Sequence, residues 1–307
     1  MSPARIAFVL VLIAVIAVAV WFGLRVERGD VVIGGKDFAE QTIVGEMAAL
    51  LIEDRTDLTV ARKFHLATGL PMKMLRKGEL DLYLDYTGTG YVDILGNTYK
   101  REDPDAIYAH VKKAYPEKFD AEWLSPLGFK NTYTLTMRRK HAEELGVTCI
   151  SDLEQHKDTL RAAFDPAFLD RKGDGYPGLK KCYGFAFETP PGQLRIGLMY
   201  KECRDGRVDV IDAFSTDGRI DKFDLKVLED DKRFFPPYDA AFVVRREVFG
   251  KHPEIREVLE ELAGRISNEE MGRLNYAVEE EDRRARDVAR EFLVSKGLLS
   301  AEERRAK

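Results

Sequence analysis

The chain is poor in the residues and motifs on which most enzymes depend. Its 307 residues include only three cysteines and five histidines. The phosphate-binding, dinucleotide-binding, nucleophile-elbow and zinc-protease motifs are all missing from the sequence. The histidines are dispersed and mostly have polar neighbours, which favours surface positions over a metal site. We therefore expect a protein that is not an enzyme and that uses neither a metal nor a cofactor.

The cysteines are too few and too widely spaced for a metal-binding Cys-x-x-Cys pair or a dense disulfide framework. They stand at Cys149, Cys182 and Cys203. Cys182 and Cys203 are candidates for one bridge in an oxidising compartment, with Cys149 left over. Three small buried thiols are the alternative, and the sequence leaves both open.

The sequence also lacks an excess of basic residues. It has 48 Lys and Arg against 53 Asp and Glu, a net charge of −5, and the basic residues are scattered among acidic ones. This argues against a nucleic-acid partner. With 45% hydrophobic and 33% charged residues, the bulk of the chain has the composition of a soluble globular protein. Its length suggests two domains.

One long apolar run is present, at the N-terminus. Residues 6–24 are uncharged and mostly apolar. A membrane-spanning helix needs about 17–25 such residues, whereas the apolar part of a secretory signal has about 7–15. The length favours an uncleaved anchor, although Ala17 and Ala19 form a small-x-small cleavage signal that leaves cleavage open. We assign residues 1–29 to a signal or anchor segment and expect the remainder to be exported.

Beyond the anchor, strand patterns alternate with helix patterns. A buried strand over residues 31–33 is predicted to end at a turn made by Gly34 and Gly35, and helical spacing follows. Amphipathic helices are predicted over residues 253–299. The other predicted strands are 58–64, 80–86, 131–137, 162–164, 208–214 and 240–244. This order predicts two α/β lobes with largely parallel sheets, and no breakable linker separates them.

Four short segments combine charged, hydroxyl or aromatic residues with turn residues. Residues 34–41 join a strand to a helix, and the helix amides together with Lys36 favour an anion, although a solvated lysine is the alternative. Residues 85–90 follow a strand and read equally well as an ordinary turn. Residues 128–133 and 234–238 add aromatics that, taken singly, are typical of core packing.

Together these segments resemble a known family. Six segments occur in the order and approximate spacing of the osmoprotectant-binding proteins of glycine betaine/choline ABC transporters, and the resemblance extends from residue 31 to about 299. It implies a type II periplasmic-binding-protein fold whose two α/β lobes close on the ligand. Lobe 1 would comprise residues 31–130 and 239–307, and lobe 2 residues 131–238. The six segments are 34–41, 85–90, 131–133, 171–184, 212–220 and 234–238.

The same resemblance implies a ligand-binding site between the lobes. A quaternary ammonium has no N–H to donate, so such proteins surround it with the faces of aromatic rings. The family usually has tyrosine where this chain has Phe214, which keeps the aromatic face but lacks the hydroxyl. The matching aromatic positions are Tyr86, Tyr133, Phe214 and Tyr238; those for a ligand carboxylate are Lys36, Thr89 and Arg171; Asn131 completes the set.

The function implied is that of an extracytoplasmic solute-binding protein of an ABC importer. It would bind a quaternary-ammonium solute such as glycine betaine or choline and deliver it to a membrane permease driven by a separate ATPase. We expect a monomer, either tethered by the helix over residues 6–24 or released after its cleavage. An enzyme or a ligand sensor on the same two-lobed fold is the alternative, since a fold does not fix a function.

Overall fold

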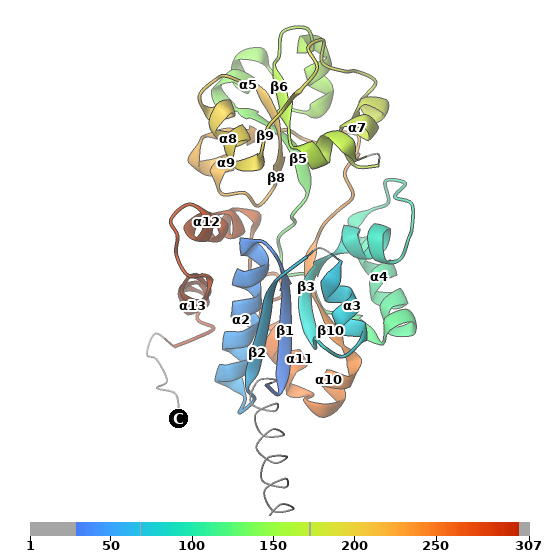
Figure 1. Cartoon of the computed structure of the whole chain (residues 1–307), viewed down its shortest axis with the longest axis vertical. Helices are drawn as coiled ribbons and strands as arrows, with labels where there is room; N and C mark the ends of the chain where they lie inside the picture. The colour runs from blue at the N-terminus through green and yellow to red at the C-terminus, as the bar shows by residue number, and fades with distance from the viewer. Residues whose placement is uncertain (1–28, 68, 172, 301–307) are drawn as a thin grey trace, which may run out of the picture.

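The computed structural model describes residues 29–67, 69–171 and 173–300. The predicted anchor at residues 6–24 lies outside them. Within the described ranges, no helix combines the length and the apolar character needed to cross a membrane. The structure contains two sheets, which lie one above the other along the long axis of the molecule (Figure 1). We call the two parts lobe 1 and lobe 2 with the boundaries given above, which stay a prediction.

The lobe 1 sheet is mixed rather than largely parallel. β1 runs parallel to β2 and β3, but β10 runs antiparallel to both β3 and β4. The chain that returns from lobe 2 enters this sheet at the edge where β3 ends, so Ala240 pairs with Tyr86 and β10 must run in the opposite direction. In spatial order the strands are β2 (Val60–Leu66), β1 (Val31–Lys36), β3 (Leu82–Tyr86), β10 (Ala240–Arg245) and β4 (Ala121–Trp123).

The lobe 2 sheet is mixed as well. β6 is parallel to β7 and β8, whereas β5 is antiparallel to β8 and β9. The first residue of β5, Tyr133, therefore pairs with the last residue of β8, Phe214. In spatial order the strands are β7 (Gly192–Gln193), β6 (Ala162–Phe164), β8 (Val210–Phe214), β5 (Tyr133–Arg138) and β9 (Leu225–Val227).

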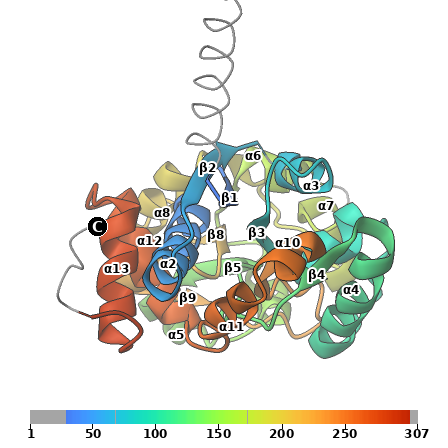
Figure 2. The same ribbon diagram turned by 90° about the horizontal axis from the view of Figure 1, so that it is seen from below.

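Helices cover both faces of each sheet, which makes each lobe a three-layer α/β unit. In lobe 1, α2 packs against α11, α12 and α13 on one face, and α3 and α4 cover the other (Figure 2). The lobe 1 helices are α2 (Ala39–Arg55), α3 (Leu70–Arg76), η1 (Thr89–Ile94), α4 (Pro104–Phe119), α10 (Arg246–Lys251), α11 (Glu254–Glu260), α12 (Asn268–Glu279) and α13 (Ala285–Ser295). Those of lobe 2 are α5 (Arg139–Leu145), η2 (Ile150–His156), α6 (Pro166–Asp170), α7 (Tyr176–Tyr183), α8 (Ile196–Arg204) and α9 (Arg219–Lys222).

The glycine pair after the first strand does not form the predicted turn. β1 continues through both glycines to Lys36. A side chain at Gly34 would place its Cβ 2.3 Å from Leu80 Cδ1, and one at Gly35 would come within 2.9 Å of Phe64 Cδ1. These glycines therefore permit close packing at the strand, and the extension of β1 carries Lys36 to the edge that faces lobe 2.

All three cysteines are free thiols in the structure. Cys203 is buried, and Cys182 is partly buried, with its sulfur accepting a hydrogen bond from Arg101 at 3.1 Å. The structure therefore has free thiols, as in one of the two alternatives that the sequence leaves open, but only Cys203 is buried.

Candidate functional site

Five of the predicted site residues come together where the two sheets face each other. Lys36 ends β1 and Tyr86 ends β3, while Tyr133 begins β5 and Phe214 ends β8. Asn131 lies on the chain that crosses between the lobes, and its backbone N–H donates to the carbonyl of Tyr238 at 3.1 Å on the other crossover. Ligands of open α/β folds commonly bind at such strand ends.

Lys36 is buried and forms an ion pair within lobe 1. Its side-chain Nζ lies 2.6 Å from Asp85 Oδ1, and the residue is 5% exposed. The Tyr83 hydroxyl donates to the other oxygen of Asp85 at 2.7 Å. The Lys36 ammonium also lies 5.1 Å from the centroid of the Tyr86 ring. The positive charge of Lys36, which the sequence predicts will attract an anion, is thus neutralised by Asp85. The sequence analysis did not single out Asp85.

Tyr86 is held by residues at the start of α2 and by the residue just before it. Its hydroxyl donates to Glu40 and accepts from Gln41 Nε2 at 3.2 Å. The ring of Phe38, which immediately precedes α2, stacks on it with centroids 6.5 Å apart and 19° between the planes. Burial and the neighbouring Glu40 carboxylate raise the pKa of Tyr86 well above its usual range, so its hydroxyl stays protonated and acts as a donor.

Tyr133 and Phe214 form an aromatic pair on lobe 2. Their centroids are 4.8 Å apart, and Tyr133 also contacts Phe168 and Phe235. Among the described residues, ring contacts join neither member of this pair to Tyr86 or Tyr238. The four predicted aromatic positions therefore do not form one continuous ring cluster in this structure.

Arg171 is anchored beside Tyr133 by an acidic residue of its own segment. Its Nε and Nη2 donate to the two oxygens of Asp174 at 2.8 and 2.7 Å. The guanidinium carbon lies 5.5 Å from the Tyr133 ring centroid, and the Tyr238 hydroxyl donates to Asp174 at 3.1 Å. Asp174 thus ties two predicted site residues together. Arg171 and Asp174 lie between α6 and α7, outside a helix, so no periodic pattern of the sequence pointed to this contact.

η1 brings a further acidic group toward the same region. Thr89, the predicted hydroxyl contact, is the first residue of η1 and is partly buried. Asp93 lies on the same short helix; burial raises its pKa, as do Asp174 and Asp85, whereas Arg171 and Lys36 lower it. Asp93 is therefore within the electrostatic influence of both Lys36 of lobe 1 and Arg171 of lobe 2.

A cavity of about 290 Å³ lies next to this cluster. Two predicted residues line it, Asn131 and Phe214. The sequence analysis did not single out the other seven, two of which come from α12, near the C-terminus. They are Phe38, Glu40, Thr216, Asp217, Arg219, Asn275 and Glu279.

Glu40 is the most buried charged group of this cavity. It is 1% exposed, and burial raises its pKa, whereas the hydrogen bonds that it accepts act in the opposite direction. Its Oε1 accepts from Tyr86 and from Asn131 Nδ2, and its Oε2 accepts from Asn275 Nδ2 at 3.2 Å. Glu40 therefore links Asn131, on one crossover, and Asn275, on α12, to Tyr86 at the end of β3.

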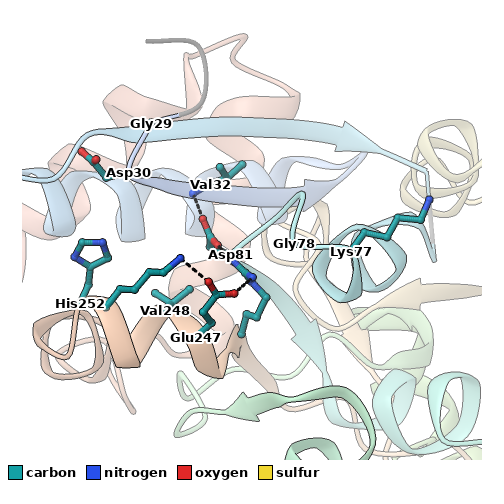
Figure 3. Close-up of a pocket in the computed structure, with 11 residues that line it drawn as sticks. Gly29, Asp30, Val32, Lys77, Gly78, Asp81, Glu247, Val248 and His252 are labelled. Carbon is teal, nitrogen blue, oxygen red and sulfur yellow. Dashed lines mark hydrogen bonds and ion pairs between the residues drawn. The ribbon is translucent and has the colours of Figure 1, made fainter. Parts of the chain in front are cut away.

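A second cavity, of about 370 Å³, lies at the opposite end of the lobe 1 sheet (Figure 3). Asp81 accepts the Val32 N–H at 2.8 Å and pairs with Arg245 at 2.6 Å, while Lys251 pairs with Glu247 at 2.5 Å. None of the predicted site residues lines this cavity. We therefore take the interlobe region as the candidate site.

Comparison with known protein families gives one match across almost all of the described chain. Residues 29–295 match the family described as the substrate binding domain of the ABC-type glycine betaine transport system. The chain is 36% identical over 263 residues to the carnitine transport binding protein OpuCC of Listeria monocytogenes, with 85% of each chain covered. It is 35% identical to a glycine-betaine-binding protein of Pseudomonas aeruginosa, covering 87% of this chain and 88% of that one.

A third relative is a longer protein. The ergothioneine transport permease/ergothioneine binding protein EgtU of Helicobacter pylori is 35% identical over 94% of this chain, which spans about half of that relative, 52% of its length. Among solved structures, one described as a glycine betaine/carnitine/choline ABC transporter matches with a TM-score of 0.83 at 34% identity, over 88% of this chain and 99% of the other. Apo YehZ of Escherichia coli matches with a TM-score of 0.76 at 27% identity, over the same shares.

Proposed function

The chain belongs to the family of substrate-binding domains of ABC-type glycine betaine transport systems, and from this premise we propose which of its residues bind the solute. Its homologues include substrate-binding proteins for glycine betaine and carnitine. We propose that this protein binds a betaine, a solute with a trimethylammonium group and a carboxylate, between its two α/β lobes and delivers it to a membrane permease.

The observation that carries this proposal is the aromatic pair Tyr133 and Phe214. Phe214 lines the same cavity as Phe38 and Glu40, the two residues that contact Tyr86 of lobe 1. Each ring face that meets a quaternary ammonium contributes about 0.5–2 kcal/mol when water is excluded. The rings come from different lobes, so all of them reach one ligand only if the lobes approach each other. We propose that Tyr238, on the crossover, completes the aromatic set when the lobes close.

We propose that the carboxylate of the ligand is bound by Arg171, Thr89 and Lys36. Arg171 donates hydrogen bonds from Nε and Nη2 to Asp174. Its side chain is 39% exposed, and its Nη1 group is not used in this pair. We propose that Nη1 donates to the ligand carboxylate. Thr89 adds a hydroxyl at the start of η1. Lys36 has three N–H donors, of which Asp85 takes one, and it contributes positive charge at the end of β1.

The same proposal covers the oligomeric state, the location and the partners of the protein. The protein acts as a monomer outside the cytoplasm, has no catalytic activity of its own, and depends on a permease and a separate ATPase. The helix predicted over residues 6–24 either tethers it to the membrane or is cleaved.

Calorimetric titration of the full-length protein tests the proposal. Glycine betaine, carnitine, ergothioneine and choline are the probes, and at least one of the three betaines is expected to bind without turnover. Binding of none of them, or conversion of any into a product, would contradict the proposed function.

Arg171→Ala sharpens this test. This variant should weaken the binding of a betaine by about 2–5 kcal/mol, the range for truncating one partner of a buried charge pair. The binding of choline, which lacks the carboxylate, should be weakened much less. Arg161→Ala is the matched control, because Arg161 also pairs with an aspartate of lobe 2, Asp209, which immediately precedes β8, at the end of that strand opposite Phe214. Equal losses for betaine and choline would show that Arg171 does not contact the carboxylate.

A further inference from the structure

The two lobes also meet at a contact away from the crossovers and from α12. It joins residues 97–103 of lobe 1, which lie between η1 and α4, to lobe 2. The Tyr99 hydroxyl donates to the backbone carbonyl of Arg233 at 3.3 Å, and Arg101 Nη2 donates to Cys182 Sγ on α7 at 3.1 Å. In Figures 1 and 2, α4 and α7 lie on the opposite side of the molecule from α12, so this is a separate contact between the lobes.

On the lobe 1 side, Glu102 braces the loop that carries both donors. Its Oε2 accepts the backbone N–H of Lys100 at 2.7 Å, and its Oε1 accepts from the Tyr91 hydroxyl of η1 at 3.3 Å. Burial, together with the nearby Asp230 and Glu102 carboxylates, raises the pKa of Tyr99 to about 12, so its hydroxyl is protonated and can donate at neutral pH. The two donors flank Lys100 in one braced loop, and we therefore expect them to move together.

On the lobe 2 side, both acceptors belong to one packed unit. The Tyr183 hydroxyl donates to Asp230 at 2.5 Å, which joins α7 to the segment that contains Arg233. Asp230 also accepts the backbone N–H of Phe235 at 2.8 Å. The Phe235 ring lies against Tyr133, with centroids 6.4 Å apart and 26° between the planes. The acceptor side of the contact is therefore connected to the aromatic pair of the proposed ligand site.

This contact is weaker than the one made by α12. It consists of two side-chain hydrogen bonds, one of them to sulfur, a weak acceptor. Arg101 is exposed, and Tyr99 and Cys182 are only partly buried. At α12, by contrast, an ideal Cβ on Gly218 would lie 2.3 Å from the Gly272 carbonyl oxygen, so the two backbones are close-packed. Because one hydrogen bond shifts an equilibrium by about two- to tenfold, the weaker contact can break while each lobe stays folded.

We propose that residues 97–103 form a latch that joins the two lobes beside the ligand site and lifts from lobe 2 when the lobes separate. Tyr99 and Arg101 make and break their contacts together, because one braced loop carries both. A bound betaine that contacts both lobes favours the latched form, and the latch in turn slows its release. This effect of the ligand rests on the proposed function, whereas the latch itself does not.

The reaction of Cys182 with N-ethylmaleimide measures how often the latch is open. Mass spectrometry of the digested full-length protein separates this rate from that of Cys149, a partly buried thiol that caps η2 within lobe 2. Tyr99→Phe removes one hydrogen bond of the latch but not the one to Cys182. It should nevertheless speed the Cys182 reaction about threefold or more and leave the Cys149 rate unchanged. Tyr108→Phe is the matched control, because the Tyr108 hydroxyl donates to the Leu124 carbonyl within lobe 1 at 3.0 Å, and it should change neither rate.

A second arm of the experiment adds a betaine. The probe is whichever of glycine betaine, carnitine and ergothioneine binds in the calorimetric titration. It should slow the Cys182 reaction about threefold or more and leave the Cys149 rate unchanged. Tyr99→Phe should also raise the dissociation rate of that betaine, measured by stopped-flow fluorescence, about two- to tenfold, whereas Tyr108→Phe should not.

The outcomes separate the latch from the proposed function. The latch is overturned if Cys182 reacts at the same rate in Tyr99→Phe and Tyr108→Phe, or if Tyr99→Phe speeds the reactions of Cys149 and Cys182 equally. A betaine that binds without slowing the Cys182 reaction would also overturn it and leave the proposed function standing. If none of the three betaines binds, the proposed function fails, and the rates without ligand still decide whether the latch exists.

Discussion

At the scale of single residues, the lobe 2 sheet contains a carboxyl group whose ionisation is costly. Asp212 on β8 is fully buried, and its Oδ1 accepts the backbone N–H of Asp165 at 2.7 Å. Its Oδ2 has no partner among the described residues. Burial raises the pKa of Asp212 from 3.8 to about 7. The folded protein therefore holds a proton here that the unfolded chain releases at lower pH.

This predicts a pH dependence of stability. Because the folded-state pKa of Asp212 is raised, folding becomes less favourable as the pH rises from about 4 to about 7, and the full penalty is present above that range. Asp212→Asn should therefore stabilise the protein at pH 8 by about 2–4 kcal/mol, at about 1.4 kcal/mol per pKa unit, and have little effect at pH 4. Urea unfolding at the two pH values measures this difference. The same effect at both pH values would contradict the assignment.

The residues of the site differ in how far sequence reveals them. Tyr133 and Phe214 lie in strong strand patterns, and antiparallel pairing of those strands brings the two rings together. Asn275 belongs to a charged amphipathic helix and is 235 positions from Glu40, so no local pattern relates the two. Asp85 and Asp174 neutralise the cations that the sequence predicts for an anion, and only the fold reveals these partners.

At the scale of elements, α12 is the lobe 1 helix that contacts lobe 2 at the end of β8. An ideal Cβ on Gly218 would lie 2.3 Å from the carbonyl oxygen of Gly272 and 2.5 Å from Tyr276 Cβ. The Asn268 side chain donates to the carbonyl of Lys130 at 2.8 Å, on the crossover. The backbone of α12 thus lies directly against the segment that follows Phe214.

Gly218→Ala should disturb this contact. Its methyl group would collide with backbone atoms that cannot rotate away, and overpacking of this kind destabilises proteins by about 1–3 kcal/mol. Gly250→Ala is the control, since a Cβ at Gly250, in helix α10, has no heavy atom within 4 Å. The control should be neutral or slightly stabilising. Urea unfolding compares the two, and equal stability would contradict the close approach.

The strand positions were largely predictable at this scale, whereas the end of β1 and the direction of β10 were not. β6 has the predicted bounds, and β8 and β10 end within a residue of theirs, because β-branched and aromatic runs are distinct. The extension of β1 to Lys36 depends on how closely Leu80 and Phe64 approach the two glycines. The antiparallel direction of β10 depends on the chain path through lobe 2, which local periodicity does not encode.

At the scale of the whole molecule, the two lobes are joined by adjacent crossovers. Lys130 and Asp239 form an antiparallel bridge and an ion pair at 3.3 Å, and Asn131 hydrogen-bonds to Tyr238 beside them. The crossovers therefore bring two predicted site residues next to the connection between the lobes. This arrangement fits a protein whose lobes move about the connection while the ligand contacts residues on both sides.

Above all, we propose that the interlobe site recognises the positive charge of a trimethylammonium group through aromatic faces. The most direct measurement compares, by calorimetry on the full-length protein, glycine betaine with 3,3-dimethylbutanoate, in which carbon replaces the charged nitrogen. Shape and carboxylate are retained, and only the charge is removed. Because each ring contributes about 0.5–2 kcal/mol to a cation and loses that contribution to the neutral group, the analogue should bind at least about tenfold more weakly. Equal or tighter binding of the neutral analogue would show that the site is merely hydrophobic and would contradict the account.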